Sequence, residues 1–194
     1  MIALDTTILV ALHRVESIHH PSALAAYRDA GGDGAAWAIP WPCVHEFLGV
    51  VTHPRIFSPA TPIDIALSAI DSWRARPNTR LLSEDDTYWP ILVDLVRAGA
   101  IAGPRIHDAR IAALCLAHGV RELWTADRDF SRFPKLRTRN PLVSSGSPRL
   151  LTVEESAVAS SGARDLPVLK RRAGKAKPKV TRAIVDRIRD KVAR

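Results

Sequence analysis

The sequence has few cysteines and no long apolar run, and these absences exclude several classes of protein. Its 194 residues include two cysteines, Cys43 and Cys115, which lie 72 positions apart. This spacing fits neither a zinc motif nor a disulfide framework, so we expect buried thiols and a reducing cytoplasm. No stretch approaches the roughly 20 apolar residues of a membrane helix, and the N-terminal residues lack the pattern of a signal peptide.

The net charge of +8 is confined to the C-terminal part of the chain. Residues 155–194 hold 12 Lys and Arg against 4 Asp and Glu, while residues 1–154 hold 16 of each sign. The basic excess therefore describes an extension and not the main domain.

Residues 1–143 alternate short apolar runs with longer helical patterns, as expected for one domain with its own core. We expect strands at 2–4, 37–39, 80–82, 122–125 and 141–143. We expect helices at 6–13, 21–31, 43–51, 63–73, 85–98 and 107–118. Strands separated by helices predict right-handed crossovers and an α/β fold, in which helices cover both faces of a central parallel sheet.

The basic extension divides into two predicted parts. Residues 144–179 are rich in Ala, Ser, Gly, Lys and Pro, which is typical of a flexible linker. Residues 180–194 predict a basic amphipathic helix, because apolar residues recur at every fourth position, namely Val180, Ile184, Ile188 and Val192. This helix would contact a phosphate backbone, dock onto a partner or the domain, or only increase solubility, and the sequence leaves all three open.

Four acidic residues stand at element boundaries or among apolar neighbours. Asp5 directly follows the first predicted strand, and Asp127 follows the 122–125 strand in the same way. Asp108 opens a predicted helix on its inward stripe, and Glu46 borders the buried stripe of the 43–51 helix. Because sites in open parallel sheets form at the carboxyl ends of strands, these side chains are candidates for one site.

Each acidic residue also has an ordinary structural explanation. Asp5 and Asp108 could cap the helices that follow them, Asp127 could belong to a turn, and Glu46 could be a solvated helix position. For Asp5 the site is the better explanation, because a helix cap need not interrupt so apolar a run as MIALDTTILV. Burying a lone carboxylate costs several kcal/mol unless it is paired, hydrogen-bonded or bound to a metal.

Four converging carboxylates would require a cation. At an effective dielectric constant near 20, each ionised pair within about 5 Å repels by roughly 3 kcal/mol. A divalent ion would neutralise this charge, and an all-oxygen ligand set favours Mg²⁺ or Mn²⁺ over zinc. Such ions activate water for attack on phosphates. The seven histidines are scattered and form no competing zinc motif.

Four stretches of the sequence carry a resemblance to a known family. They are MIALDTTILV, VHEFLGV, IHDARIAALCLAHGVRELWTADRDFSRFPKL and the following RNPL. Together they resemble a PIN-domain ribonuclease of the VapC toxin type, over roughly residues 1–143. The resemblance implies a PIN-like three-layer α/β/α fold, to which this chain adds its basic C-terminal extension.

The resemblance implies a Mg²⁺- or Mn²⁺-dependent endoribonuclease in which Asp5, Glu46, Asp108 and Asp127 are the catalytic metal ligands. Thr7 and Thr125 fall on supporting polar positions, where they would hold a ligand, a water or the phosphate. Asp129 falls outside the metal cluster. The expected setting is a type II toxin–antitoxin system in the cytoplasm, with an RNA substrate, a cognate antitoxin and a homodimer as the partners.

Three arginines near the motifs are candidate phosphate contacts, namely Arg14, Arg110 and Arg128. For each of them, an ordinary surface position is the competing explanation. Two rival functions also remain: a degenerate PIN module that binds RNA without catalysis, and a phosphatase-like α/β enzyme with Asp5 as its nucleophile. The phosphatase chemistry usually needs a second acid two positions later, where this sequence has Thr7.

Overall fold

The structure, a computed structural model, describes residues 1–143 as a three-layer α/β/α domain. Its strands are β1 (Ile2–Leu4), β2 (Trp37–Pro40), β3 (Thr79–Leu82), β4 (Glu122–Trp124) and β5 (Thr138–Arg139). Its α-helices are α1 (Thr6–His13), α2 (His20–Asp29), α3 (Trp41–Val51), α4 (Ile63–Arg74), α5 (Tyr88–Ala98) and α6 (Ile106–Ala117). Short 3-10 helices are η1 (Gly32–Gly34), η2 (Gly103–Arg105) and η3 (Arg128–Arg132). The predicted linker and amphipathic helix lie outside the described residues.

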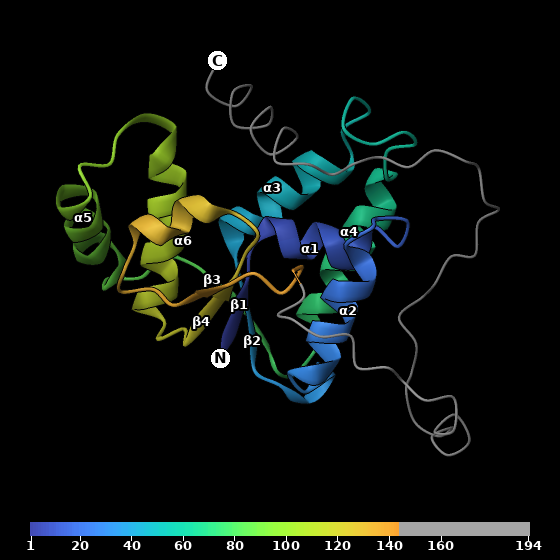
Figure 1. Ribbon diagram of the computed structural model, residues 1–194, viewed down its shortest axis with the longest axis horizontal. Helices are drawn as coiled ribbons and strands as arrows, with labels where there is room; N and C mark the ends of the chain where they lie inside the picture. The colour runs from blue at the N-terminus through green and yellow to red at the C-terminus, as the bar shows by residue number, and fades with distance from the viewer. Residues whose placement is uncertain (144–194) are drawn as a thin grey trace.

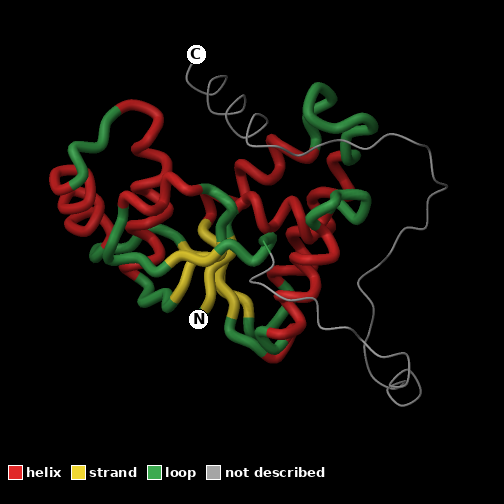
Figure 2. Tube along the Cα trace, in the orientation of Figure 1, coloured by secondary structure: helices red, strands yellow, loops and turns green. Residues whose placement is uncertain are grey.

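The strands form one parallel sheet in the order β3-β2-β1-β4-β5. Helices α1 to α4 lie on one side of this sheet and α5 and α6 on the other (Figure 1). The strands fill the space between the two helical layers (Figure 2), which explains why all three residues of β1 are buried. The predicted fold class is confirmed.

The strand order places a switch point at β1. From β1 the chain proceeds to β2 and β3 in one direction, and later to β4 and β5 in the other. The loops that leave β1 and β4 therefore diverge at the carboxyl ends of two adjacent strands. In open α/β sheets, this crevice is where ligands bind.

Two predicted elements are wrong in part or entirely. The helix predicted from residue 85 begins at Tyr88, because Asp85 accepts hydrogen bonds from the Thr87 N–H at 2.9 Å and the Thr87 hydroxyl at 2.6 Å, forming a turn. The strand predicted at 141–143 is absent from this part of the described chain. There the Leu142 N–H donates to Asn140 Oδ1 at 2.9 Å in another turn, and the last strand is the earlier β5.

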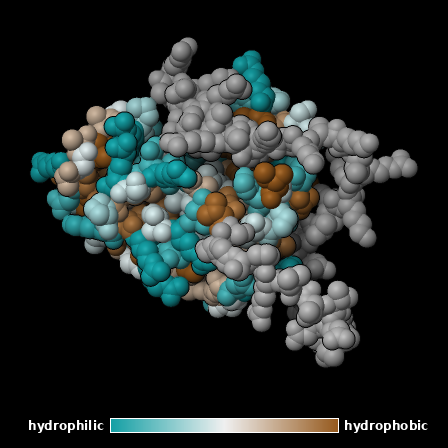
Figure 3. Space-filling model, in the orientation of Figure 1, coloured by the Kyte–Doolittle hydropathy of each residue, from teal (hydrophilic) through white to brown (hydrophobic). Residues whose placement is uncertain are grey.

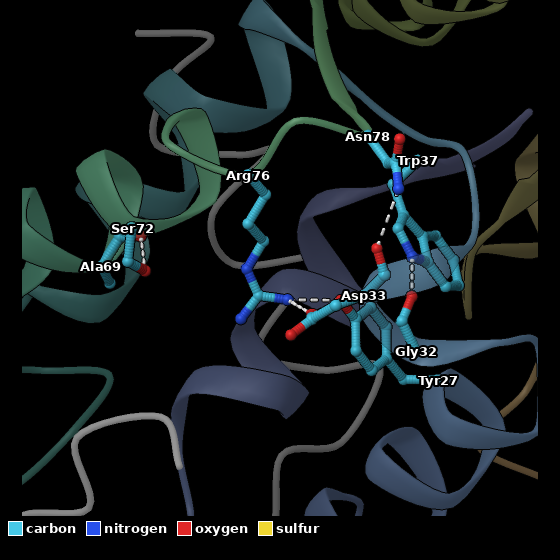
Figure 4. A network of polar contacts seen from close by, with 8 residues as sticks. All are labelled: Tyr27, Gly32, Asp33, Trp37, Ala69, Ser72, Arg76 and Asn78. Atoms are coloured by element: carbon cyan, nitrogen blue, oxygen red, sulfur yellow. Dashed lines mark hydrogen bonds and ion pairs between the residues drawn. The ribbon is translucent and has the colours of Figure 1, made fainter. Parts of the chain in front are cut away.

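A polar network stabilises the opposite, amino-terminal end of the sheet (Figure 4). Arg76 donates to both the Tyr27 hydroxyl and the Asp33 carboxylate, and Tyr27 donates to Asp33 at 2.7 Å. The Tyr27 ring stacks on Trp37 at the start of β2, with centroids 4.7 Å apart. Burial, followed by the hydrogen bond to Asp33, raises the pKa of Tyr27 to about 12. These contacts join α2, β2 and the segment before β3.

No helix within residues 1–143 is both long enough and apolar enough to cross a membrane.

Candidate active site

Asp5 lies at the carboxyl end of the central strand, where the sequence predicts it. It occupies the N-cap position of α1, but its side chain makes no capping hydrogen bond. Its Oδ2 instead accepts hydrogen bonds from the Thr125 hydroxyl at 2.7 Å and the Thr7 hydroxyl at 3.1 Å. The carboxylate is therefore held by a side chain from the first turn of α1 and by one at the end of β4, and helix capping does not explain its presence.

The surroundings of Asp5 disfavour its charged form. The residue is only 4% exposed, and this burial is the main reason that its pKa is raised from 3.8. The Thr125 hydroxyl, the nearby Thr6 backbone N–H and the Thr7 hydroxyl lower the pKa, but they do not outweigh burial. The charge of Asp127 raises it further, which shows that the two carboxyl groups are electrostatic neighbours.

The hydroxyls of Thr7 and Thr125 connect Asp5 to the loop after β4. Besides donating to Asp5, the Thr7 hydroxyl accepts from the Ala126 N–H at 3.0 Å. The Thr125 hydroxyl accepts from the Asp127 N–H, also at 3.0 Å. Each hydroxyl thus uses its donor on the carboxylate and an acceptor lone pair on the backbone. The loop that carries Asp127 is thereby fixed relative to Asp5.

Asp127 is both a turn residue and a neighbour of Asp5. It is the N-cap of η3, and its Oδ1 accepts from the Asp129 N–H at 2.9 Å. This is the turn geometry that the sequence offers as the ordinary explanation. The turn leaves the side chain half-buried at the end of β4, within electrostatic range of Asp5.

Glu46 approaches the same site from α3. It is half-buried, and its Oε2 accepts a hydrogen bond from the Thr6 hydroxyl at 2.6 Å. Thr6 is itself buried in the first turn of α1. Thr6 is not among the residues predicted for the site, although a hydroxyl on the inward side of α1, directly after Asp5, is a signal for it.

Asp108 is buried near the amino-terminal end of α6. It is the third residue of the helix, and Arg105 occupies the N-cap position, so Asp108 lies in the first turn and is not the N-cap residue. Its exposed fraction is 7%, and α6 packs against α3, β2 and η3. Asp108 therefore belongs to the helical layer opposite α1, and its place in the site stays a prediction.

Cys43 is a second neighbour of Asp5 that the sequence analysis did not place there. Its thiol donates to Asp5 Oδ1 over 3.7 Å, and both Cys43 and Cys115 are buried and free of disulfides. Burial, then the charges of Asp5 and Glu46, raises the pKa of the Cys43 thiol. Burial also raises the pKa of Cys115. The prediction of buried thiols is confirmed.

The three candidate arginines occupy different environments. Arg14 is buried, donates to the Thr61 hydroxyl at 2.8 Å and the Pro59 carbonyl at 3.1 Å, and stacks over Phe57. Its guanidinium is thus engaged inside the protein, which disfavours a phosphate contact. Arg110 is half-exposed and pairs with Glu84 at 2.5 Å, and Arg128 is exposed.

The donor chemistry of this site fits a hard divalent cation. The groups are carboxylate and hydroxyl oxygens, and the ionised form of Asp5 lacks a compensating positive charge among the groups that shift its pKa. As the side chains stand, no group of three or more His, Cys, Asp and Glu residues within 1–143 could hold a metal ion. The centre formed by four carboxylates therefore stays a prediction.

The fold and the site together define a class of protein. It is an α/β domain with a parallel sheet, and its acidic residues lie just beyond the carboxyl ends of the central strands. The family model described as PIN domain matches residues 2–136. Ribonuclease VapC48 of Mycobacterium tuberculosis is 30% identical over 138 residues, which cover 71% of this chain and 94% of that protein. VapC ribonuclease Mb2897 of Mycobacterium bovis is 30% identical over 142 residues, covering 73% and 96%. The chain belongs to the PIN-domain family, in which its relatives are of the VapC type.

Solved structures share the same fold. VapBC2 from Rickettsia felis, bound to a DNA fragment from its promoter, matches with a TM-score of 0.52 and 22% identity, covering 72% of this chain and 98% of that chain. VapC20 of Mycobacterium tuberculosis, a toxin that cleaves the sarcin-ricin loop, matches with a TM-score of 0.50 and 15% identity, covering 68% and 93%.

Proposed function

We propose that this protein is a Mg²⁺- or Mn²⁺-dependent endoribonuclease, and that it acts in the cytoplasm as the toxin of a type II toxin–antitoxin system. The observation that carries the proposal is the Asp5 carboxylate, which is buried at the switch point although its charged form is disfavoured there. Buried carboxyl groups with shifted pKa values are concentrated at functional sites. Relatives of this chain that are named ribonucleases support the reaction class.

The four predicted ligands would hold the ion, namely Asp5, Glu46, Asp108 and Asp127. The bound ion would supply an activated water and would stabilise the charge that develops on the phosphate oxygens. Thr7 and Thr125 keep the Asp5 carboxylate in one orientation, and Thr6 orients Glu46 through Oε2. Either Glu46 or Asp108 would take the proton from the attacking water.

Two rival functions are less well supported. The phosphatase-like chemistry needs a second acid two residues after Asp5, but Thr7 stands there and uses its hydroxyl on Asp5 and Ala126. A non-catalytic PIN module would not require all four acidic positions to be filled, as they are in this chain.

A cognate antitoxin and a second copy of the chain are the proposed protein partners. Similar structures include the toxin–antitoxin complex from Klebsiella pneumoniae, which matches with a TM-score of 0.50 and 18% identity. Apolar groups gather on the surface in the half of the molecule that contains α1 and α4 (Figure 3). Large apolar side chains are exposed in that region, namely Val15, Ile18, Ile63 and Leu67. Such a surface is typical of protein interfaces.

The cleavage of RNA by the purified full-length protein tests the proposed function. We expect Mn²⁺ to support cleavage and EDTA to stop it. The Asp5→Asn variant should not cleave RNA, while its circular dichroism spectrum should remain that of the parent. Sequencing of the new RNA ends would then identify the cut site. Cleavage that persists in EDTA, or equal cleavage by Asp5→Asn, would contradict the proposal.

A further inference from the structure

Two aromatic rings form a pair in the first turns of α3, and the second of them, His45, directly precedes Glu46. Trp41 and His45 are separated by one helical turn, and their ring centroids are 5.7 Å apart with an interplanar angle of 32°. His45 is exposed, whereas Trp41 is half-buried and packs in part against the core. The Trp41 ring is therefore held in place by the protein while part of it stays accessible.

The ring pair lies near an arginine that is held in an ion pair with Glu84. Helix α3 packs against α6, which carries Arg110. Arg110 pairs with Glu84, and the pKa of Glu84 is lowered first by its own backbone N–H, then by Arg110 and, more weakly, by His45. His45 and Arg110 thus both lie close enough to Glu84 to act on its charge, and His45 directly precedes Glu46 on α3.

This combination matches what an unpaired nucleotide requires. A base that is not stacked in a duplex presents a flat face for an aromatic ring, and its phosphate presents charge for an arginine. A folded core does not require the second ring, because His45 is exposed to solvent. Trp41 directly follows β2, which pairs in parallel with β1, so the ring pair begins at the carboxyl edge of the sheet, where Asp5 also lies.

We propose that Trp41 and His45 form a stacking subsite for one unpaired nucleobase beside the scissile phosphate, with Arg110 contacting an adjacent phosphate. The subsite selects single strands and loops over duplex RNA, because a paired base cannot leave its stack without a further energetic cost. This proposal rests on the proposed ribonuclease function and assigns Trp41 and His45 to contact with its substrate.

Binding measured without cleavage tests the subsite. The full-length Asp5→Asn protein serves as the parent, and fluorescence anisotropy at one fixed salt concentration reports its affinity for a labelled oligoadenylate of about 12 nucleotides. We expect Trp41→Ala and His45→Ala each to weaken binding about fivefold or more, and Trp41→Phe to retain most of the affinity. The same strand annealed to its complement should bind all these proteins equally.

A matched control is available on another helix. Trp89 is 66% exposed on α5, which lies at the edge of the molecule, away from α3 (Figure 1). Trp89→Ala should bind the single strand as the parent does. His45 is exposed, so His45→Ala should leave the core intact. This variant therefore still tests the subsite if Trp41→Ala does not fold.

The possible results separate the two proposals. Unchanged single-strand affinity in both His45→Ala and folded Trp41→Ala would overturn the subsite, while the cleavage assay with Mn²⁺ would still stand for the ribonuclease function. An equal loss of duplex and single-strand binding would also overturn it, because stacking requires an unpaired base. A parent that binds no RNA and a wild type that cleaves none would overturn both proposals together.

Discussion

Replacing Asp5 by Asn should stabilise the metal-free protein while it removes activity. Burying a carboxylate costs several kcal/mol, and two hydroxyl donors to a charged acceptor return about 1.5–3 kcal/mol each. The raised pKa of Asp5 indicates that the free-energy cost of burying the charge exceeds the stabilisation by these hydrogen bonds. Asn keeps the size of the side chain and an oxygen for Thr7 and Thr125, but it carries no charge. We expect a gain of about 1 kcal/mol, or about 2–4 °C in Tm, at pH 7 in EDTA.

The stability difference between Asp5→Asn and the wild type should change with pH in a definite direction. Because the folded pKa of Asp5 lies above the unfolded value of 3.8, its favourable contribution is complete below pH 3.8 and is lost as pH rises through the folded pKa. The advantage of Asp5→Asn over the wild type should therefore grow from pH 4 towards neutrality. The lowered pKa values of Glu84 and Asp85 affect both proteins equally and cancel in the difference. Thermal unfolding in EDTA that shows a less stable variant at pH 7, or a constant difference, would refute the reasoning.

Three other substitutions test contacts around and away from the site. Thr125→Val keeps the shape but removes the hydroxyl between Asp5 and the Asp127 N–H, so urea unfolding should show a loss of about 1–3 kcal/mol, with slower RNA cleavage. Arg14→Met should lower the free energy of unfolding by about 2–4 kcal/mol in the same measurement. The salt dependence of RNA binding should not change; if Arg14 contacted a phosphate, its removal would reduce that dependence. Arg76→Ala should cost about 1–2 kcal/mol and leave the cleavage rate unchanged; a slower rate would mean that the network at the amino-terminal end of the sheet influences the site.

The sequence predicts the elements that carry a strong local pattern. The strand at 2–4 and the helix at 6–13 have the predicted bounds, because the apolar run and the following helical residues leave little choice. The central place of β1 and the location of Asp5 at its end follow from the rules of parallel sheets. The short β5 could not be predicted, because Thr138–Arg139 is exposed and polar, and it is held by backbone pairing with β4 and by the Arg139 guanidinium over the Trp124 ring.

The contacts within the site depend on residues that are distant in the sequence. Thr125 meets Asp5 across 120 positions, and Thr6 meets Glu46 across 40. Periodicity in a single sequence indicates which face of an element is buried, but not which hydroxyl meets which carboxylate. Arg14 illustrates the same limit, because Thr61, 47 residues away, engages the guanidinium that local sequence suggests is exposed.

The central claim is that the buried acidic residues bind a divalent ion, and calorimetric titration of the chelator-treated protein with Mn²⁺ tests it most directly. The account predicts saturable binding by the wild type, and its loss in Asp5→Asn and in Asp108→Asn. Asp129→Asn should bind as the wild type does, since Asp129 is predicted to lie outside the cluster. Binding that survives both substitutions, or a wild type that takes up no Mn²⁺, would contradict the account.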